Sequence, residues 1–351
     1  QNRRQNQDKE ELYENTEQFL KEKAVYHTML NVAEDVSRGE VDTSDVLDKF
    51  EKSCNINLVT DLGLDLYSNI DTLIDDINSV EHYIPSKWDW LDNNLGGGFL
   101  EAGKSLYVFA GETNIGKSIF LGNIAHNIAK EGKNVLLITL EMSELLYARR
   151  ICSNVTKVPM KELVGNTPAI KQAIKDENGK IFIKEFPPAT ITANQLKGFI
   201  KKFQEQGIKL DAIVLDYLNL MHSTVGNNSY ERIKHVTEQV RAMSYLFECP
   251  IISATQLNRA GFDQDNPDLA TISESIGLAA TADVIVSIYQ NEEDRELGII
   301  RLGMMKNRYG PRGSTQAMRI NYSTLSIEEA DDIEFEDDGN ETLNVLAGLA
   351  S

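Results

Sequence analysis

Apolar positions follow two different spacings along this chain, and their order predicts the order of its helices and strands. Over residues 8–38, which are rich in Glu and Lys, apolar residues recur at helical spacing and predict an amphipathic helix. A second helix is expected from Ser44, a residue type that caps helix starts, to Phe50. Two such helices have too little apolar surface for a core of their own. They pack either on the domain that follows or on a neighbouring subunit.

Beyond residue 105, continuous apolar runs alternate with helical patterns. The expected strands are Leu106–Ala110, Val135–Leu140, Ile181–Phe186, Ala212–Tyr217, Ile251–Thr255, Val284–Tyr289 and Ile299–Met305, and the expected helices cover 117–130, 143–154, 194–206 and 229–247. Strands that are apolar throughout are buried on both faces, so the alternation predicts an α/β fold with a mostly parallel sheet and helices on both faces. The late strands follow one another closely, which predicts an antiparallel extension at one edge.

The pattern divides the chain into three parts. Residues 1–83 form a small helical segment, residues 84–330 an α/β domain, and residues 331–351 an acidic, then small-residue-rich tail that is typical of disorder. Hydrophobic residues make up 41% of the 351 residues, enough for a sizeable core. The sequence does not begin with Met, so we expect a further N-terminal part to precede it.

Sequence features that are missing indicate where the protein acts and whether it has a zinc site. No apolar run approaches the roughly 18 residues of a membrane-spanning helix, and the first residues do not resemble a secretory signal. We therefore expect a cytoplasmic protein with no membrane partner. The three cysteines are far apart without a CxxC pair, and the five histidines show no ligand spacing, which favours reduced thiols over a zinc site.

The formal net charge of −19 disfavours a broad nucleic-acid-binding surface. Nine acidic residues, with no basic residue among them, lie between Glu328 and Glu341, and the chain without them carries −10. Salt screens such a field beyond about 10 Å. Any contact with DNA is therefore expected to be local, through a few loops and backbone amides.

The segment GETNIGKS, from Gly111 to Ser118, fits the pattern G-x-x-x-x-G-K-[ST] between a predicted strand and a predicted helix. In that context the backbone amides and the positive end of the helix bind phosphate. Lys117 supplies a charge for the β- and γ-phosphates, and the Ser118 hydroxyl is placed for Mg²⁺. The expected nucleotide-binding residues are Gly111, Glu112, Thr113, Asn114, Ile115, Gly116, Lys117, Ser118 and Ile119.

Three other predicted strands end in side chains suited to hydrolysis. Asp216 ends an apolar strand, where a carboxylate can hold the Mg²⁺ shell. Glu141 follows the strand after the loop helix and is placed to polarise the attacking water; the alternative is an acid that caps the helix before Ser143. Gln256 ends a later strand, where its neutral amide can sense the γ-phosphate or the water; the alternative is an ordinary polar strand end.

Lys306 and Arg308 stand two residues apart in MMKNRYGPRG, before a Gly-Pro turn. Two cations that project together from one face of a strand suit a γ-phosphate. Because they are far in sequence from the phosphate-binding loop, we expect them to serve the phosphate of the next subunit, in trans. The alternative is an exposed basic turn.

Two polar connections, MHSTVGNNSYERI and LATISESIGLAATADVI, are candidates for DNA contact. Loops at this end of such a sheet point into a central channel if the subunits form a ring, and their amides and hydroxyls suit DNA phosphates. The alternative is ordinary surface loops. The DNA-binding candidates are Arg259, Ser273, Glu274, Ser275 and Gly277.

Taken in order, GETNIGKS, TLEMS, IVLDYL, SATQLNR, SESIGLAATADVI and KNRYGP resemble the motor domain of DnaB-type replicative DNA helicases, and are most similar to the branch found in T-even-like bacteriophages. The resemblance covers roughly residues 84–326, with a weaker match for the helices before them. It implies a RecA-like fold and a homo-hexameric ring. It also implies 5′ to 3′ translocation on single-stranded DNA, driven by ATP or GTP with Mg²⁺, and unwinding of the duplex ahead. A viral member acts in the host cytoplasm.

Residue by residue, the resemblance implies roles at matching positions. Lys117 and Ser118 match residues that hold the phosphate and Mg²⁺. Asp216 matches a residue that serves the metal, and Glu141 matches one that activates the water. Gln256 matches a residue that couples the nucleotide site to the DNA loop, and Lys306 and Arg308 match a trans-acting Lys-x-Arg pair.

The sequence departs from the family in two places. The DNA loop of bacterial members reads Arg-Glu-Ser-Gly, whereas here Ser273 replaces the Arg and the Gly is displaced to Gly277. The family's N-terminal collar is larger than residues 1–80 can hold, so these residues look like its last helices and the linker helix. Primase, a helicase loader or other replisome proteins are the expected partners, with the acidic tail as a candidate contact.

Two other functions share the loop and the sheet. A RecA/RadA-type recombinase would coat DNA as a filament, but the KNRYGP turn and the TLEMS context argue against it. A non-motor ATP-binding regulatory protein, as among circadian-clock-type relatives, is compatible with the acidic charge. DNA-stimulated ATP hydrolysis would exclude it.

Overall fold

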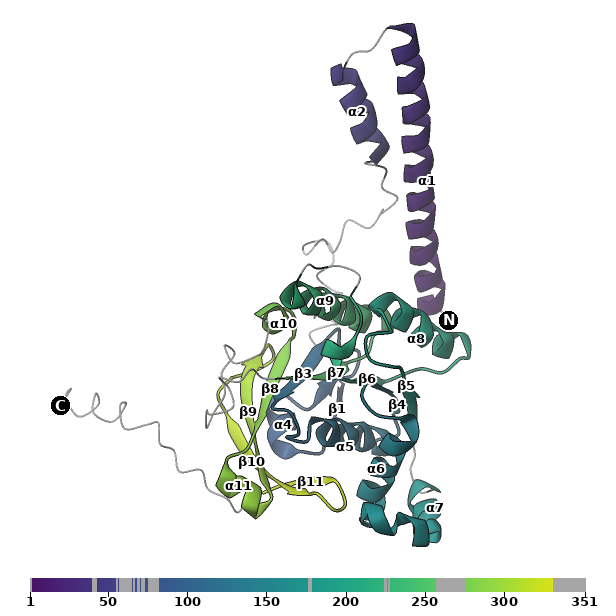
Figure 1. Ribbon diagram of the computed structural model, residues 1–351. Coiled ribbons are helices and arrows are strands. Elements are labelled where there is room, and N and C mark those ends of the chain that lie inside the picture. Colours follow the sequence, from purple (N-terminus) through teal and green to yellow (C-terminus); the bar gives the residue numbers. More distant parts are fainter. Residues whose placement is uncertain are drawn as a thin grey trace, which may run out of the picture. The chain divides into compact units, whose positions relative to one another are not determined.

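The computed structural model describes residues 2–39, 43–54, 56, 65, 67, 70, 73–74, 82–175, 179–223, 226, 228–256 and 276–330. The chain divides into two compact units, Gln1–Val80 and Glu81–Ser351 (Figure 1). The tail predicted over residues 331–351 lies outside the described residues.

The described part of the first unit is mainly helical, as the N-terminal pattern predicts. Two of its helices, α1 (Asn2–Arg38) and α2 (Thr43–Cys54), are both longer than expected. They contact each other where the hydroxyls of Thr28 and Ser53 lie 2.6 Å apart. The apolar stripe of α1 stays largely open, since Phe19 keeps 56% of its surface exposed.

A nine-stranded sheet forms the centre of the second unit (Figure 1). In sheet order its strands are β11 (Ser326–Glu329), β10 (Thr315–Asn321), β9 (Ile299–Asn307), β8 (Val284–Tyr289), β3 (Leu106–Gly111), β7 (Ile251–Gln256), β6 (Ala212–Asp216), β4 (Asn134–Thr139) and β5 (Lys180–Glu185). The strands from β8 to β5 are parallel, whereas β9, β10 and β11 pair antiparallel at one edge. This is the mostly parallel sheet with an antiparallel extension that the sequence predicts.

Helices cover both faces of the sheet. The second unit contains α4 (Asp89–Asn94), α5 (Lys117–Lys130), α6 (Glu144–Thr156), α7 (Thr167–Lys175), α8 (Ala193–Glu205), α9 (Ser229–Phe247), α10 (Ile276–Thr281) and α11 (Glu292–Leu297), with 3₁₀ turns at Met160–Gly165 and Leu218–Leu220 and a small hairpin of β1 (Tyr83–Ile84) and β2 (Phe99–Leu100). The helices α4, α5 and α6 contribute to one hydrophobic cluster and α8, α9 and α10 to the other.

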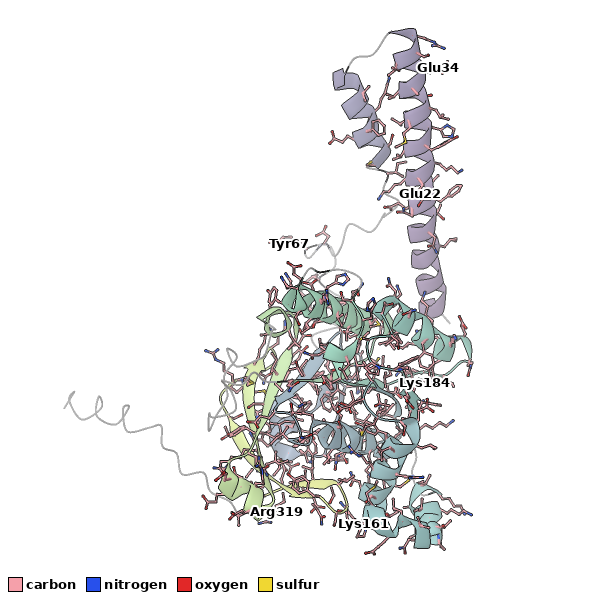
Figure 2. The ribbon with its side chains drawn as sticks, viewed as in Figure 1. Glu22, Glu34, Tyr67, Lys161, Lys184 and Arg319 are labelled. Atoms are coloured by element: carbon pink, nitrogen blue, oxygen red, sulfur yellow. The ribbon has the colours of Figure 1, made fainter. Side chains whose placement is uncertain are left out.

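The central strand β3 shows how the two clusters arise. Successive side chains of a strand point to opposite faces. Phe109 therefore packs with Phe120 of α5, and Val108 belongs to the opposite cluster with Val240 of α9. Every residue of β3 is buried, which explains why its sequence is an uninterrupted apolar run. Figure 2 shows side chains filling the layers between the sheet and its helices.

Every strand predicted from an apolar run is present, with ends within two residues of the predicted ones. The sequence does not reveal β10 and β11, because these late strands include exposed polar positions and so give no continuous apolar run. No described helix is long and apolar enough to cross a membrane.

Candidate active site

The phosphate-binding loop joins the end of β3 to the start of α5. Asn114 (φ 64°) and Gly116 (φ 101°) take left-handed conformations that curl the chain back on itself. A Cβ on Gly111 would lie 2.8 Å from Ile115 Cγ2, so only glycine fits there without a shift. Gly116 is the N-cap of α5 and provides no side-chain cap. The first amides of α5 can therefore bind an anion at the positive end of the helix.

The ammonium of Lys117 lies inside the loop. It donates to the carbonyl oxygens of Gly111 at 3.0 Å and Glu112 at 2.5 Å. Burial lowers the pKa of Lys117 to about 8, although the carboxylates of Asp216 and Glu141 favour its charged form. Lys117 therefore stays mostly charged at neutral pH.

The other predicted loop residues take several environments. Thr113 is exposed beside Asn114, whereas Ile115 is buried. Ile119 lies in the first turn of α5 and packs partly against the core. The main-chain oxygen of Ser118 accepts a hydrogen bond from a buried tyrosine on α6.

The sheet order brings the predicted hydrolytic residues to one end of the parallel strands. The neighbouring strands β3, β7, β6 and β4 are parallel, so their carboxyl ends lie side by side (Figure 1). Gly111 at the end of β3 is in register with Gln256 at the end of β7. Asp216 at the end of β6 is in register with Thr139 of β4, two residues before Glu141. Residues spread over the sequence from 111 to 256 thus lie together at the carboxyl ends of these strands.

Asp216 is the most unusual side chain at the carboxyl ends of these strands. It is fully buried, and neither carboxylate oxygen has a hydrogen-bond partner among the described residues. Burial raises the pKa of Asp216 to about 6. The hydroxyl groups of Ser118 and Tyr147 and the positive charge of Lys117 oppose this shift. The peptide bond that follows Asp216 is cis. A buried carboxylate without a partner is costly unless a cation joins it, so Asp216 and Ser118 fit the Mg²⁺ that accompanies a bound triphosphate.

Glu141 lies in the turn after β4 and is exposed. The alternative role, capping of α6, belongs to another residue, because Ser143 is the N-cap and its hydroxyl accepts from the amide of Leu146 at 3.3 Å. Glu141 is close enough to Lys117 and Asp216 to influence the pKa of both. Its carboxylate is therefore near the loop and open to a reacting water.

Gln256 contacts the phosphate-binding loop directly. Its side-chain amide donates to the hydroxyl of Thr113. Gln256 is also the last described residue before position 276. This neutral amide therefore joins the nucleotide loop to the chain that leads toward the predicted DNA loop.

Tyr147 is a further residue of this site, and no sequence motif indicates it. Its hydroxyl donates to the main-chain oxygen of Ser118 at 2.9 Å, and burial raises its pKa well above the ordinary value. It lies on α6, one turn after the Ser143 cap, and links the turn that carries Glu141 to the start of α5. A lone tyrosine on the inner face of a helix looks like core in a sequence, so no pattern distinguishes it.

Arg308 lies at the other end of the parallel strands, where β3 and β8 begin. It donates to Asp283 Oδ1 at 2.8 Å, and the other oxygen of Asp283 accepts from the amide of Leu106 at the start of β3. The phosphate-binding loop begins at the other end of the same strand, at Gly111. Because β3 spans Leu106–Gly111, its two ends are separated by roughly 17 Å.

Lys306 lies near Arg308 but makes different contacts. Its ammonium donates to the carbonyl oxygens of Ala279, Ala280 and Ala282 at 2.8, 3.2 and 2.7 Å, at the C-terminal end of α10. A lysine satisfies helix-terminal carbonyls in this way and complements the helix dipole. Lys306 lies in β9 and Arg308 just beyond its end, and within the chain the two cations bind separate partners.

Most of the predicted DNA-binding residues, Arg259, Ser273, Glu274 and Ser275, lie outside the described residues. Gly277 lies in α10, where an added Cβ would come within 2.6 Å of the Lys234 side chain of α9. Its role in contacting DNA stays a prediction.

The fold and the loop define a nucleotide-binding ATPase with a RecA-like sheet. A family model described as "DnaB-like helicase C terminal domain" matches residues 84–325, and the chain belongs to that family. This membership favours a helicase over the recombinase and the regulatory protein considered above.

Individual relatives agree with this assignment. The "DnaB-like replicative helicase" of Enterobacteria phage T4 is 23% identical over 96% of this chain and 75% of its own length. The "Replicative DNA helicase DnaB" of Geobacillus stearothermophilus is 26% identical over 74% of this chain and 59% of its own length. This chain thus spans less than two thirds of the length of the bacterial relative.

Solved structures share the fold. One solved ATPase domain superposes with a TM-score of 0.66 at 19% identity, covering 77% of this chain and 100% of that one. A structure of a DnaB-like replicative helicase and its interactions with primase gives 0.64 at 18% identity, covering 91% of this chain and 78% of that one.

Proposed function

We propose that this chain is the motor of a ring-forming replicative DNA helicase. It couples NTP hydrolysis at subunit interfaces to 5′ to 3′ translocation on single-stranded DNA and to unwinding of the duplex. The observation that carries this proposal is the position of Arg308, at the end of β3 opposite to the end that carries the chain's own phosphate-binding loop. In a closed ring of identical head-to-tail contacts, two different surfaces of the chain meet at each interface, so that the surface with Arg308 can face the loop of the neighbour.

Each predicted residue at the carboxyl ends of the parallel strands has a role in this proposal. Lys117 and the first amides of α5 bind the β- and γ-phosphates, while Ser118 and Asp216 hold Mg²⁺. Bound Mg²⁺ supplies charge that stabilises the transferring phosphoryl group. Glu141 orients the attacking water and accepts its proton. Gln256 senses the γ-phosphate and links it to the chain beyond β7.

Lys306 and Arg308 complete the site of the next subunit. A cation supplied in trans stabilises the charge that develops on the phosphoryl group. Arg308 has the easier movement, because its side chain is 63% exposed and its guanidinium reaches Asp283 through a single hydrogen bond. Lys306 would have to leave three carbonyl oxygens.

The partners follow from the same proposal. The ring is a homo-hexamer that encloses single-stranded DNA, with Arg259, Ser273, Glu274, Ser275 and Gly277 as candidate contacts. A solved relative is described with primase, which supports primase as a partner of this chain. A helicase loader or another replisome protein, and action in the host cytoplasm, belong to the same proposal.

Strand displacement on forked duplexes tests motor activity and polarity together. We expect this chain, with ATP or GTP and Mg²⁺, to release the strand from a fork that offers a 5′ loading tail and not from one that offers only a 3′ tail. Lys117→Ala is the control, and we expect it to displace neither strand because the phosphate-binding lysine is missing. Displacement from the 3′ tail alone would reverse the assigned polarity, and no displacement from either would remove the motor.

A further inference from the structure

The buried carboxylate of Asp283 collects more than one cation. Its side chain is 1% exposed, and Arg241 of α9 binds it through Nε at 3.0 Å and Nη2 at 2.8 Å. The same carboxylate accepts from Arg308 Nη1 at 2.8 Å and from the amide of Leu106 at 3.0 Å. Two guanidinium groups therefore share one buried negative charge.

The two arginines are held very differently. Arg241 binds both oxygens of Asp283, lies 5.3 Å from the ring centre of Tyr245, and has a side chain only 23% exposed. The guanidinium of Arg308 reaches a single carboxylate oxygen, and this side chain is 63% exposed, whereas the main-chain amide of Arg308 donates to the carbonyl oxygen of Asp283 at 3.1 Å. Arg241 is thus the fixed partner of Asp283, and Arg308 is the exchangeable one.

The cost of moving Arg308 depends on this second partner. Removing the counter-ion of a buried carboxylate leaves an uncompensated charge, which is strongly unfavourable. With Arg241 in place, Asp283 keeps a bidentate cation and the Leu106 amide when Arg308 departs. Without Arg241, Arg308 would become the remaining direct cationic partner of Asp283 among the described residues.

We propose that Arg241 is a positioning residue for catalysis in trans: it keeps Asp283 paired, so that Arg308 is free to leave that carboxylate for the phosphate of the neighbouring subunit. This inference rests on the proposed function, in which Arg308 acts on the neighbour's nucleotide. A purely structural Arg241, which only ties α9 to the start of β8, is the competing explanation. The two differ in what neutralising Asp283 does to an Arg241 variant.

The test measures steady-state NTP hydrolysis and thermal unfolding of the full chain in four variants: Arg241→Gln, Asp283→Asn, the double variant and Arg308→Ala. We expect Arg241→Gln to lower kcat at least about tenfold with an unchanged KM, because Arg308 stays on the unpaired Asp283. We expect Asp283→Asn to stay within about threefold of the wild type, since the Asn oxygen still accepts from Leu106. Adding Asp283→Asn to Arg241→Gln should restore kcat, because Arg308 is no longer held.

A matched control separates catalysis from stability. Arg301 binds both oxygens of Asp294 in the same bidentate way, with side-chain exposures of 23% and 3%. We expect Arg301→Gln to lower the unfolding temperature as much as Arg241→Gln does, and to keep the wild-type kcat.

The outcomes distinguish this inference from the proposed function. Wild-type kcat in Arg241→Gln, or a double variant no faster than Arg241→Gln, overturns the positioning role while leaving the trans arginine intact. Wild-type kcat in Arg308→Ala overturns the trans arginine itself. Loss of hydrolysis in Asp283→Asn as deep as in Arg308→Ala would mean that Asp283 must hold Arg308 for catalysis, which also overturns the inference.

Discussion

At the scale of single residues, the site depends on a fully buried acid and a half-buried base whose pKa values move toward each other. Burial raises the pKa of Asp216 to about 6 and lowers that of Lys117 to about 8. Desolvation disfavours the charged form of each group, so it acts in opposite directions on an acid and a base. Both residues are ionised only between these two values.

A pH profile of nucleotide binding follows from these shifts. Below about pH 6, Asp216 takes up a proton and loses the charge that a divalent cation needs; above about pH 8, Lys117 loses the charge that the phosphates need. We expect the affinity for a fluorescent nucleotide with Mg²⁺ to be highest between these limits and to fall on both sides. A lower limb centred near the ordinary value of an Asp, about 4, would contradict the burial argument.

At the scale of elements, a carboxylate from the end of the domain fixes the start of α4. The amides of Asp89 and Trp90 donate to the two oxygens of Glu329, at 2.9 and 2.7 Å. Negative charge is favourable at a helix N-terminus, where the amides have no partners within the helix. Glu329 belongs to the acidic run noted in the sequence, so this run begins inside β11 and not in the tail.

We expect Glu329→Gln to lower the free energy of unfolding by about 1 kcal/mol, because an amide accepts with one oxygen only and brings no charge. Glu328→Gln is the matched control. Its carboxylate is 72% exposed beside Lys157, and such surface pairs contribute little. Equal shifts of the urea unfolding midpoint for both variants would show that the contact to α4 is not what stabilises this end of the sheet.

At the scale of the whole molecule, Lys117 and Arg308 lie at opposite ends of the parallel strands, and the proposed function therefore makes hydrolysis a property of an assembly. We expect Arg308→Ala to retain nucleotide affinity and to lose about 10³-fold in kcat, as loss of a trans arginine does elsewhere. Mixing Arg308→Ala chains with Lys117→Ala chains should restore part of the hydrolysis, because some interfaces then join an intact loop to an intact arginine.

The control for this mixture is Arg308→Ala mixed with the double variant Lys117→Ala/Arg308→Ala, in which no interface contains the arginine. It should remain inactive. Recovery in that control, or wild-type turnover by Arg308→Ala alone, would rule out an arginine that acts across the interface.

The sequence by itself determined the local chemistry of this protein. A phosphate-binding loop is formed by a continuous stretch of backbone, so its residue types at Gly111, Gly116 and Lys117 are sufficient to predict it. Buried parallel strands are equally readable, because burial on both faces requires apolar residues throughout. The half-exposed strands β10 and β11 escape this rule, and Tyr147 looks like any core aromatic until Ser118 lies beside it.

Only the tertiary structure decided which distant residues meet. The sheet order brings Gln256 and Asp216 to the phosphate-binding loop and places Arg308 at the other end of the parallel strands. It also joins Arg241 to Asp283, which are 42 positions apart in the sequence. No spacing of residue types in the sequence predicts this pair. Such pairings depend on strand order and on helix packing across the sheet, which are set by burial of both faces at once and not by any single segment.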